Sequence, residues 1–407
     1  MSITPKALQN IRIVDLSRVL AGPSCTQILG DLGAEIIKIE KPGEGDDTRG
    51  WGPPYLKDKN GNDTTESAYY LSCNRNKKSL SIDIKKQEGQ EIIHKLLEKS
   101  DILIENFKTG GLSKYGLDFE SIHKRHPHII YASITGFGQN GPLASEPGYD
   151  YLAQAMSGLM AVTGEPEGQP MKVGVALSDI MTGLNAAIGI LAALNHRHKS
   201  GKGQHIDVSL LDCTLAAMTN IAQYYLTSGE IAPRLGNAHS TIVPYQAFEA
   251  LDGYIILAIG NNGQFERFCT YIGKPEWSKD VKYATNSARV KHRAELVPQI
   301  AEIIAARKVG DWVSGLIEAD VPCGPVNAMD QTFSMQQIKE RGMKIEMNHP
   351  LSVTPINLVG SPIKMSETPP SYDLPPPVCG AHNDEVLKNI LKLGDEDIKE
   401  LRSKNII

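Results

Sequence analysis

A carboxylate at the start of a long apolar segment is the strongest chemical feature of this sequence. Ser178 and Asp179 stand in the stretch VALSDIMTG, directly ahead of the apolar run from Ile180 to Leu194. Short polar side chains at such a position predict helix N-caps, and the free N–H groups and dipole of a first helical turn favour an ionised carboxylate. Because the usual serine-hydrolase and Walker signatures are absent, a carboxylate nucleophile is the simplest enzymatic chemistry here. The alternative is that Asp179 only caps the helix.

Cationic, aromatic and glycine residues gather in the loops that follow the predicted strands. In a parallel α/β sheet, ligands bind beyond the carboxyl ends of the strands. The residues just past those ends are Arg18, Lys41, Asn106, Phe107 and the loop Gly136 to Pro142. A polar loop from Pro42 to Tyr55 adds Arg49 and Trp51. A set of basic loop residues of this kind would suit a phosphorylated ligand, although each lysine alone is equally typical of a solvated surface.

Strands and helices alternate along the first half of the chain. Short apolar runs bounded by turn residues predict strands at 11–16, 34–40, 77–84, 101–106, 128–135 and 203–209. Amphipathic segments between them predict helices at 25–32, 87–100, 117–125 and 210–228, besides the central helix. This alternation indicates an α/β fold with a Rossmann-like, doubly wound parallel sheet. The glycine fingerprint of dinucleotide-binding folds is missing after the first strand, however.

The pattern changes after residue 228, so we expect three regions. Residues 1–228 form the large Rossmann-like domain, and residues 229–330 form a second, smaller α+β domain. In the smaller domain, two strands at 245–250 and 254–258 meet at an Asp252-Gly253 turn, and three amphipathic helices follow. Residues 331–407 contain a Pro-rich extended linker between Pro350 and Pro377, then two helices that return to the large domain.

Composition narrows the class of protein. The chain has 407 residues, enough for two cores, and its net charge of -5 without blocks of like charge argues against nucleic-acid binding. The apolar run from Ala186 to Leu194 is too short to span a bilayer. The N-terminal segment has no signal or transit character, so we expect a cytoplasmic protein. The six cysteines lack a C-x-x-C spacing, and no histidine cluster has a metal-binding pattern.

The sequence resembles the class III (CaiB/BaiF) CoA-transferases over nearly its whole length. This family includes formyl-CoA transferase and carnitine CoA-transferase, with α-methylacyl-CoA racemase as a close relative. The matching segments, in the family's order, are DLSRVLAGPSCTQILGDLGAEIIKIEKPGEGDDTRGWGPPY, NRNKKSLSIDIK, DILIENF, SITGFGQNGP, GYDYLAQAMSGLM, ALSDIMTG, GKGQHIDVSLLD and PCGPV.

The resemblance implies a reaction and an assembly. It identifies Asp179 as the nucleophile that attacks a donor acyl-CoA, forming a mixed anhydride and then an aspartyl-CoA thioester. Coenzyme A would be part of the substrate, with no permanently bound cofactor and no metal. The family's interlocked homodimer is expected as well, in which each chain threads through the other.

A single position separates the branches of the family. The racemase relatives carry a histidine as an α-carbon base where this chain has Tyr149, in the triplet Gly148-Tyr149-Asp150. A 2-methylacyl-CoA racemase is therefore the less favoured alternative, together with a catalytically silent CoA-binding protein. Tyr149 could also be an ordinary packing residue at a helix start.

The resemblance also implies a CoA-binding site and a substrate class. The residues so implied, by their positions in the family's motifs, are Val19, Ala21, Lys41, Ile82, Asp83, Ile84, Lys85, Asn106, Phe107, Lys108 and Lys114. Oxalate-specific members have a glutamine where this chain has Leu20, which argues against oxalate. The segments NRNKKS, WGPPY and HSTIVPYQAF are most similar to the succinate/hydroxymethylglutarate (glutarate) CoA-transferases. Arg18 or Arg49 would then bind the distal carboxylate of a dicarboxylic acyl group, unless either binds a CoA phosphate or forms a structural ion pair.

Overall fold

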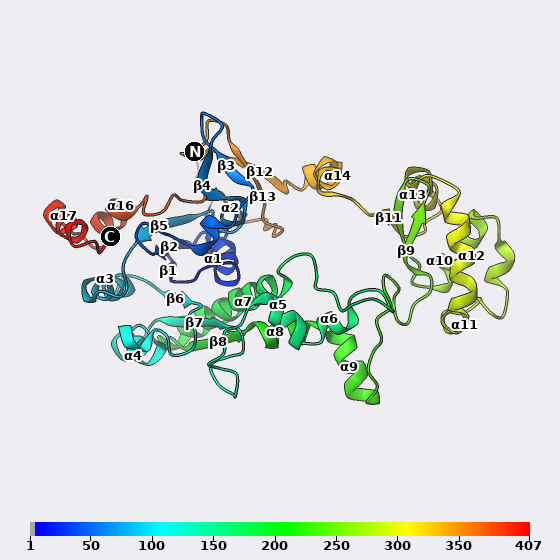
Figure 1. Ribbon diagram of the computed structural model, residues 1–407, viewed down its shortest axis with the longest axis horizontal. Helices are drawn as coiled ribbons and strands as arrows, with labels where there is room; N and C mark the ends of the chain where they lie inside the picture. Colours follow the sequence, from blue (N-terminus) through cyan, green and yellow to red (C-terminus); the bar gives the residue numbers. More distant parts are fainter. Residues whose placement is uncertain (1–4) are drawn as a thin grey trace. The chain divides into compact units, whose positions relative to one another are not determined.

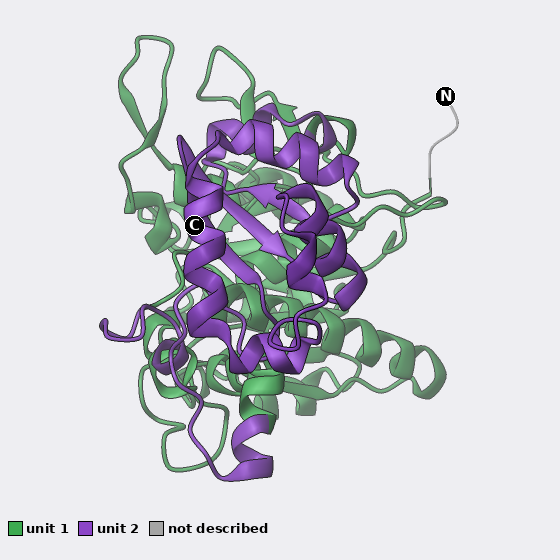
Figure 2. Ribbon diagram, turned by 90° about the vertical axis from the view of Figure 1, so that its right-hand side faces the viewer, with its two compact units in different colours: residues 1–159, 172–223, 339–407 green, residues 160–171, 224–338 purple. Residues whose placement is uncertain are grey.

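The computed structural model describes residues 5–407, which form two compact units (Figure 2). Unit 1 contains the described residues up to Leu159, together with Lys172–Gln223 and Lys339–Ile407, and unit 2 contains Met160–Met171 and Tyr224–Ile338. The second unit thus begins and ends several residues away from the expected limits of 229 and 330. It also takes in a short segment ahead of the central helix, because that segment folds back onto residues 234–236 through hydrogen bonds.

A six-stranded parallel sheet forms the centre of unit 1 (Figure 1). Its order is β5-β2-β1-β6-β7-β8, and every neighbouring pair is parallel. The strands are β1 Arg12–Asp15, β2 Glu35–Glu40, β5 Lys77–Ser81, β6 Ile102–Glu105, β7 Ile130–Thr135 and β8 His205–Ser209. The predicted doubly wound sheet is confirmed. Since the chain moves outward from β1 in one direction and from β6 in the other, a crevice forms at the carboxyl ends of these two strands.

Helices cover both faces of the sheet because the side chains of each strand alternate between two cores. One core holds Ile13 of β1 and packs against α1 Ala21–Asp31 and α7 Leu177–Ser200. The other core holds Val14 and packs against α3 Gln87–Leu97, α4 Phe119–Arg125, α16 Asn383–Asn389 and α17 Asp395–Ser403. The two C-terminal helices therefore pack on the same sheet as the N-terminal strand.

The central helix α7 has 24 residues and is long and apolar enough to cross a membrane by length and composition. In this structure its buried residues Ala186, Ile190 and Leu194 pack in the core beneath the sheet. The expected single helix at 210–228 is instead two, α8 Leu210–Ala217 and α9 Thr219–Ser228, and Thr219 at the start of α9 has a positive φ of 36°.

Two hairpins in unit 1 were not predicted. The strands β3 Tyr55–Lys57 and β4 Asp63–Ser67 form one, and β12 Lys344–Met347 and β13 Ile356–Val359 form the other. The second hairpin interrupts the Pro-rich stretch that was expected to be an extended linker. It forms because the alternate residues Ile356 and Leu358 are apolar and buried against Leu71.

Unit 2 is an α+β unit with an antiparallel sheet of order β11-β10-β9. Buried aromatic and aliphatic side chains, among them Phe265 and Trp312, join the sheet to its helices. Its elements are β9 Tyr245–Ala250, β10 Gly253–Ala258, β11 Cys323–Pro325, α10 Asn262–Tyr271, α11 Asn286–Lys291, α12 Arg293–Ala305, α13 Val309–Glu318, α14 Met329–Ser334 and the 3-10 turn Pro275–Ser278. The other short helical segments of the chain are α2 Ala68–Ser72, α5 Asp150–Met156, α6 Leu159–Val162, α15 Gln336–Glu340 and the 3-10 turns Asp47–Gly50 and Ser113–Tyr115.

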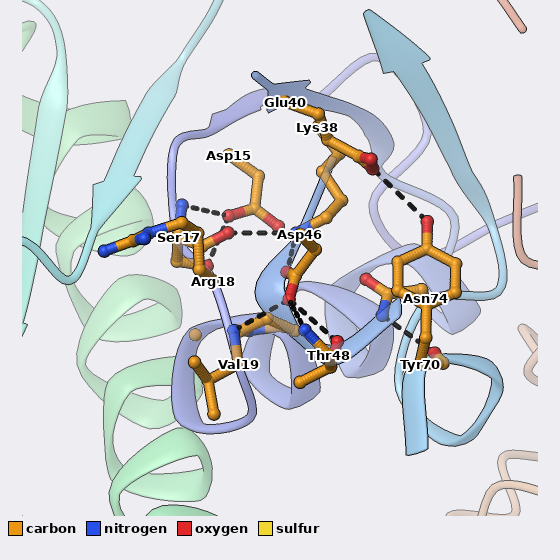
Figure 3. A network of polar contacts seen from close by, with 12 residues as sticks. Asp15, Ser17, Arg18, Val19, Lys38, Glu40, Asp46, Thr48, Tyr70 and Asn74 are labelled. Carbon is orange, nitrogen blue, oxygen red and sulfur yellow. Dashed lines mark hydrogen bonds and ion pairs between the residues drawn. The ribbon is translucent and has the colours of Figure 1, made fainter. Parts of the chain in front are cut away.

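A buried ion pair lies below the crevice of unit 1 (Figure 3). The Lys38 ammonium group of β2 donates to a carboxylate oxygen of Asp46 at 2.8 Å and to the carbonyl oxygen of Ser17 at 2.9 Å, and both charged side chains are fully buried. The other Asp46 oxygen accepts hydrogen bonds from the amides of Val19 at 3.3 Å and Thr48 at 3.0 Å. Burial alone raises the pKa of Asp46, but Lys38 and these hydrogen bonds hold that pKa at about 2. One carboxylate therefore joins β2 to the loop that follows β1.

We predict that Asp46→Ala lowers the free energy of unfolding by roughly 3–5 kcal/mol, because the substitution leaves the Lys38 charge buried without its partner. Chemical denaturation at neutral pH measures this loss. Because the folded-state pKa of Asp46 is depressed, its contribution is present above about pH 4 and is lost as the pH falls toward 2. The matched control is Asp47→Ala, which removes an exposed neighbour and should cost less than about 1 kcal/mol. Equal losses in the two variants would contradict the prediction.

Candidate active site

Asp179 lies within the first turn of α7 and does not cap it. The helix begins at Leu177, and Ala176 occupies the N-cap without a side-chain hydrogen bond, so the expectation that Ser178 and Asp179 are N-caps is wrong. The capping acceptor comes from a different helix, because the Asp150 carboxylate at the start of α5 accepts the Ser178 amide at 2.8 Å. With that amide already satisfied, the Asp179 side chain is not drawn back onto its own helix.

The Asp179 carboxyl group is half-buried and poorly stabilised as an anion. No residue in the described range 5–407 donates a hydrogen bond to it. Burial, followed by the nearby charge of Asp150, raises the pKa of Asp179 to about 7. A carboxyl group that titrates near neutral pH and lacks hydrogen-bond donors is suited to nucleophilic or proton-transfer chemistry.

Two close backbone approaches hold this turn in place. A Cβ atom on Gly183 would lie 2.6 Å from the carbonyl oxygen of Ala21, so only glycine lets α7 pack closely on the start of α1. A Cβ on Gly148 would lie 2.2 Å from the Cα of Gly136, which brings the start of α5 against the loop after β7. The glycines of SDIMTG and GYDYL thus position Asp179 and Asp150.

Asp179 opens into a cavity of about 500 Å³ in unit 1. The cavity brings together residues from the turn after β1, the loop after β6 and the start of α5. The predicted site residues that line it are Arg18, Val19, Leu20, Ala21, Trp51, Asn106, Phe107, Lys108, Gly148, Tyr149 and Asp179. Tyr149 is 64 % exposed, so it faces open space and is not a buried packing residue.

The crevice between β1 and β6 is closed at its base by hydrogen bonds. The Arg18 amide donates to the Asn106 side-chain oxygen at 2.9 Å, and the Asn106 side-chain nitrogen donates to the Arg18 carbonyl oxygen at 2.7 Å. The next residue, Val19, has a φ of 71°, a left-handed conformation that is costly for a β-branched side chain. The Asp46 hydrogen bond to the Val19 amide helps to hold this turn at the edge of the cavity (Figure 3).

A second cavity, of about 350 Å³, lies on the other side of the β1 turn. The predicted residues that line it are Arg18, Lys41, Ile82, Asp83, Ile84, Lys85 and Phe107. Lys114 does not line either cavity, but its ammonium nitrogen lies 4.9 Å from the ring centroid of Tyr115, which does line the second one. Of the lysines that line this cavity, Lys41 pairs with Glu44 and Lys85 is exposed, and an ammonium group of this kind is suited to an anionic group such as a phosphate.

Arg49 is not available to a ligand, which corrects the expectation that it binds one. Its side chain is 6 % exposed and pairs with Glu40 at 2.8 Å and Glu66 at 2.6 Å. The guanidinium group also donates to the Pro377 carbonyl oxygen at 2.9 Å and stacks 3.8 Å from the Tyr70 ring centroid. Of the alternatives that the sequence left open, the structure selects the structural ion pair.

Two residues near Asp179 were missed by the sequence analysis of the site. One is Asp150, which stands inside the GYD triplet and could have been found as a second carboxylate there. The other is Tyr69 of α2, which lies edge-on to Trp51 with ring centroids 5.3 Å apart. Burial and then the charge of Asp179 raise the pKa of Tyr69 well above its ordinary value, so its hydroxyl stays protonated. No local signal marks Tyr69, because tertiary packing alone brings it to the site.

Comparison with known proteins identifies a family. The model of "CoA-transferase family III" matches residues 8–383. The succinyl-CoA:glutarate CoA-transferase of Mus musculus is 44 % identical over 402 residues, which cover 99 % of this chain and 90 % of that protein. The succinate–glutarate CoA-transferase of Agrobacterium fabrum is 45 % identical over 383 residues, which cover 94 % of this chain and 95 % of that protein. A crystal structure of a CaiB/BaiF family protein from Brucella suis, 44 % identical, matches with a TM-score of 0.85 over 95 % of this chain and 99 % of that one.

We predict that Asp179→Asn stabilises the protein at pH 8 but not at pH 4. Because the folded-state pKa is raised from 3.8 to about 7, the unfolded chain ionises first as the pH rises, and stability falls over that interval. Asparagine removes this cost, so the melting temperature should rise by a few degrees at pH 8 and change little at pH 4. Thermal unfolding at the two pH values checks the sign. A change of equal size at both would contradict the raised pKa.

Proposed function

The chain belongs to CoA-transferase family III, and from that premise we propose that it transfers CoA from a dicarboxylyl-CoA such as succinyl-CoA through a covalent bond to Asp179. Transfer of CoA to a carboxylate is the activity of the family and of its named relatives. The observation that carries the covalent proposal is the Asp179 carboxyl group, which is half-buried, accepts no hydrogen bond from residues 5–407 and is open to the larger cavity.

The reaction balances without an external energy source. The Asp179 carboxylate attacks the thioester carbonyl of the donor, the C–S bond breaks, and a mixed anhydride and CoA thiolate form. The thiolate then attacks the Asp179 carbonyl carbon, releasing the first acid and leaving an aspartyl-CoA thioester. The acceptor carboxylate attacks that thioester and expels the thiolate, which finally attacks the acceptor carbonyl and restores Asp179. Each step exchanges one activated acyl group for another, so no ATP is needed.

In this scheme, burial of Asp179 makes its carboxylate more reactive and protects the covalent intermediates from water. A weakly solvated carboxylate has fewer hydrogen bonds to lose when it attacks. Because only the ionised form is a nucleophile, the transfer rate should rise with pH through about 7. Both covalent intermediates react with water, so the site must exclude it during turnover. Trp51 and Tyr69 are the aromatic side chains that would shield Asp179 within unit 1.

The lysines that line the smaller cavity support a division of the substrate. We propose that the smaller cavity holds the nucleotide end of CoA, with Lys41 and Lys85 near its phosphates. The larger cavity would hold the acyl group, and its cations are Arg18 and Lys108. The relatives named above act on succinate and glutarate, which are dicarboxylic acids. A dicarboxylic acyl group needs a cation for its second carboxylate, and with Arg49 sequestered this role falls to Arg18.

An apolar stripe on α7 supports a homodimer. The family resemblance implies that the two chains of this dimer are interlocked. Ile180, Leu184, Ile188 and Leu191 lie on one face of the helix and are 36 %, 46 %, 64 % and 38 % exposed. Leu152 of α5 and Leu215 of α8 are exposed as well. A contiguous apolar surface of this kind is typical of a protein interface, and we propose a second copy of the chain as its occupant.

We predict that incubation with succinyl-CoA and hydroxylamine converts Asp179 to its hydroxamate, because hydroxylamine traps either covalent intermediate. Peptide mass spectrometry locates the modification. Asp179→Ala should lose at least about a thousandfold in transfer rate while its far-UV circular dichroism stays that of the wild type. A wild-type rate in Asp179→Ala would overturn the nucleophile. Deuterium exchange at the α-carbon of a 2-methylacyl-CoA, without transfer, would favour the racemase alternative instead.

We predict that the wild-type chain elutes as a dimer in size-exclusion chromatography with light scattering. Charged substitution of the stripe, as in Leu184→Glu with Ile188→Glu, should shift it toward monomer because carboxylates cannot be buried there without partners. The control is Leu251→Glu, an exposed leucine of unit 2 outside the stripe. A monomeric wild type at micromolar concentration would contradict the proposal.

A further inference from the structure

Three residues line both cavities of unit 1, namely Arg18, Asp47 and Phe107. They therefore form the boundary between the space beside Asp179 and the space beside Lys41. An Arg18 guanidinium nitrogen lies 2.8 Å from a carboxylate oxygen of Asp47, and the guanidinium carbon lies 5.3 Å from the Phe107 ring centroid. The cation proposed for a substrate carboxylate is thus already paired with a carboxylate of the protein.

The geometry allows the pair to open without moving the backbone. The Arg18 and Asp47 side chains are 45 % and 51 % exposed, so solvent screens their attraction. Hydrogen bonds with Asn106 hold the Arg18 main chain in place. The residue before Asp47 is Asp46, which is held by its buried ion pair with Lys38. Rotation of the Asp47 side chain alone would free the guanidinium group, while Arg18 stays over Phe107.

The larger cavity has few cations, so the pairing of Arg18 with Asp47 affects how a substrate carboxylate can bind there. Its carboxylates are Asp47, Glu146, Asp150 and Asp179, and its cations are Arg18 and Lys108. An acid that places one carboxylate at Asp179 must find a cation for a second one. Arg18 offers two parallel N–H donors in a planar fork that matches a carboxylate, whereas Lys108 is a flexible point charge.

We propose that Asp47 is a specificity-determining residue that competes with the second carboxylate of a dicarboxylic substrate for Arg18. The inference rests on the proposed function. It identifies Asp47 as the group that sets the preference between dicarboxylic and monocarboxylic acids. Asp47 lowers the affinity for dicarboxylic acids because they must displace it. It leaves monocarboxylic acids unaffected, since they have no second carboxylate to pair with Arg18.

The test compares glutarate with valerate as acceptors of CoA from saturating succinyl-CoA. The donor carries a second carboxylate in both assays, so the ratio of the two KM values is the readout. In Asp47→Asn the KM for glutarate should fall about two- to fivefold, which is the range expected for an exposed ion pair, and the KM for valerate should not. The matched control is Glu146→Gln, which removes one negative charge from the same cavity without touching Arg18. Because glutarate carries one more negative charge than valerate, Glu146→Gln should lower the ratio of their KM values slightly, by less than about twofold, since no contact with Arg18 is lost.

A double-mutant cycle tests whether Asp47 affects glutarate binding through its pairing with Arg18. Arg18→Gln should raise the KM for glutarate about tenfold, and adding Asp47→Asn to it should then change nothing further. An unchanged glutarate-to-valerate ratio in Asp47→Asn, or the same shift in Glu146→Gln, would overturn the inference while the proposed function stands. A larger loss of glutarate selectivity in Lys108→Gln than in Arg18→Gln would overturn it as well. If the wild-type protein transfers CoA to neither acid, the proposed function itself fails.

Discussion

The buried Lys38–Asp46 ion pair is the constraint on which the site depends. Two charges with no exposure to solvent are stable only when each has a full set of partners. Asp46 uses its remaining hydrogen-bonding capacity on the amides of Val19 and Thr48. The same carboxylate therefore fixes the left-handed turn at Val19 and the start of the segment that carries Asp47. These two loops are walls of both cavities, so the pair sets the shape of the two cavities.

Carboxylates in this protein differ in chemistry because their surroundings differ. Asp46 is buried with a lysine and hydrogen-bond donors, and its pKa is held low. Asp179 is half-buried, has Asp150 nearby and has no hydrogen-bond donor among the residues that the structure describes, and its pKa is raised. Arg49, between Glu40 and Glu66, shows the corresponding contrast among cations, since full pairing removes it from ligand binding while Arg18 stays exposed. Burial alone does not separate a structural charge from a reactive one; the number of partners does.

The periodicity of the sequence was sufficient for the regular elements. Short apolar runs predicted all six strands of the main sheet. The pattern of the sequence changes near residue 228, and the long segment of unit 2 runs from Tyr224 to Ile338. The hairpin of β12 and β13 escaped prediction because prolines surround two short strands whose apolar side chains pack on a distant helix. The carboxylate that accepts the Ser178 amide in the first turn of α7 escaped prediction because it belongs to Asp150, 28 residues earlier in the chain.

The sequence by itself determined the alternating α/β pattern, the family resemblance and the choice of Asp179 as the candidate nucleophile, because these depend on local periodicity and on motifs in a fixed order. Only the tertiary structure buried Arg49 in ion pairs while leaving Arg18 exposed, brought Tyr69 and Asp150 to Asp179, and placed Asp47 beside Arg18. The physical reason is that the availability of a charge depends on the groups packed around it. Those groups come from strands and loops far apart in the chain, and no local pattern records which of them will meet.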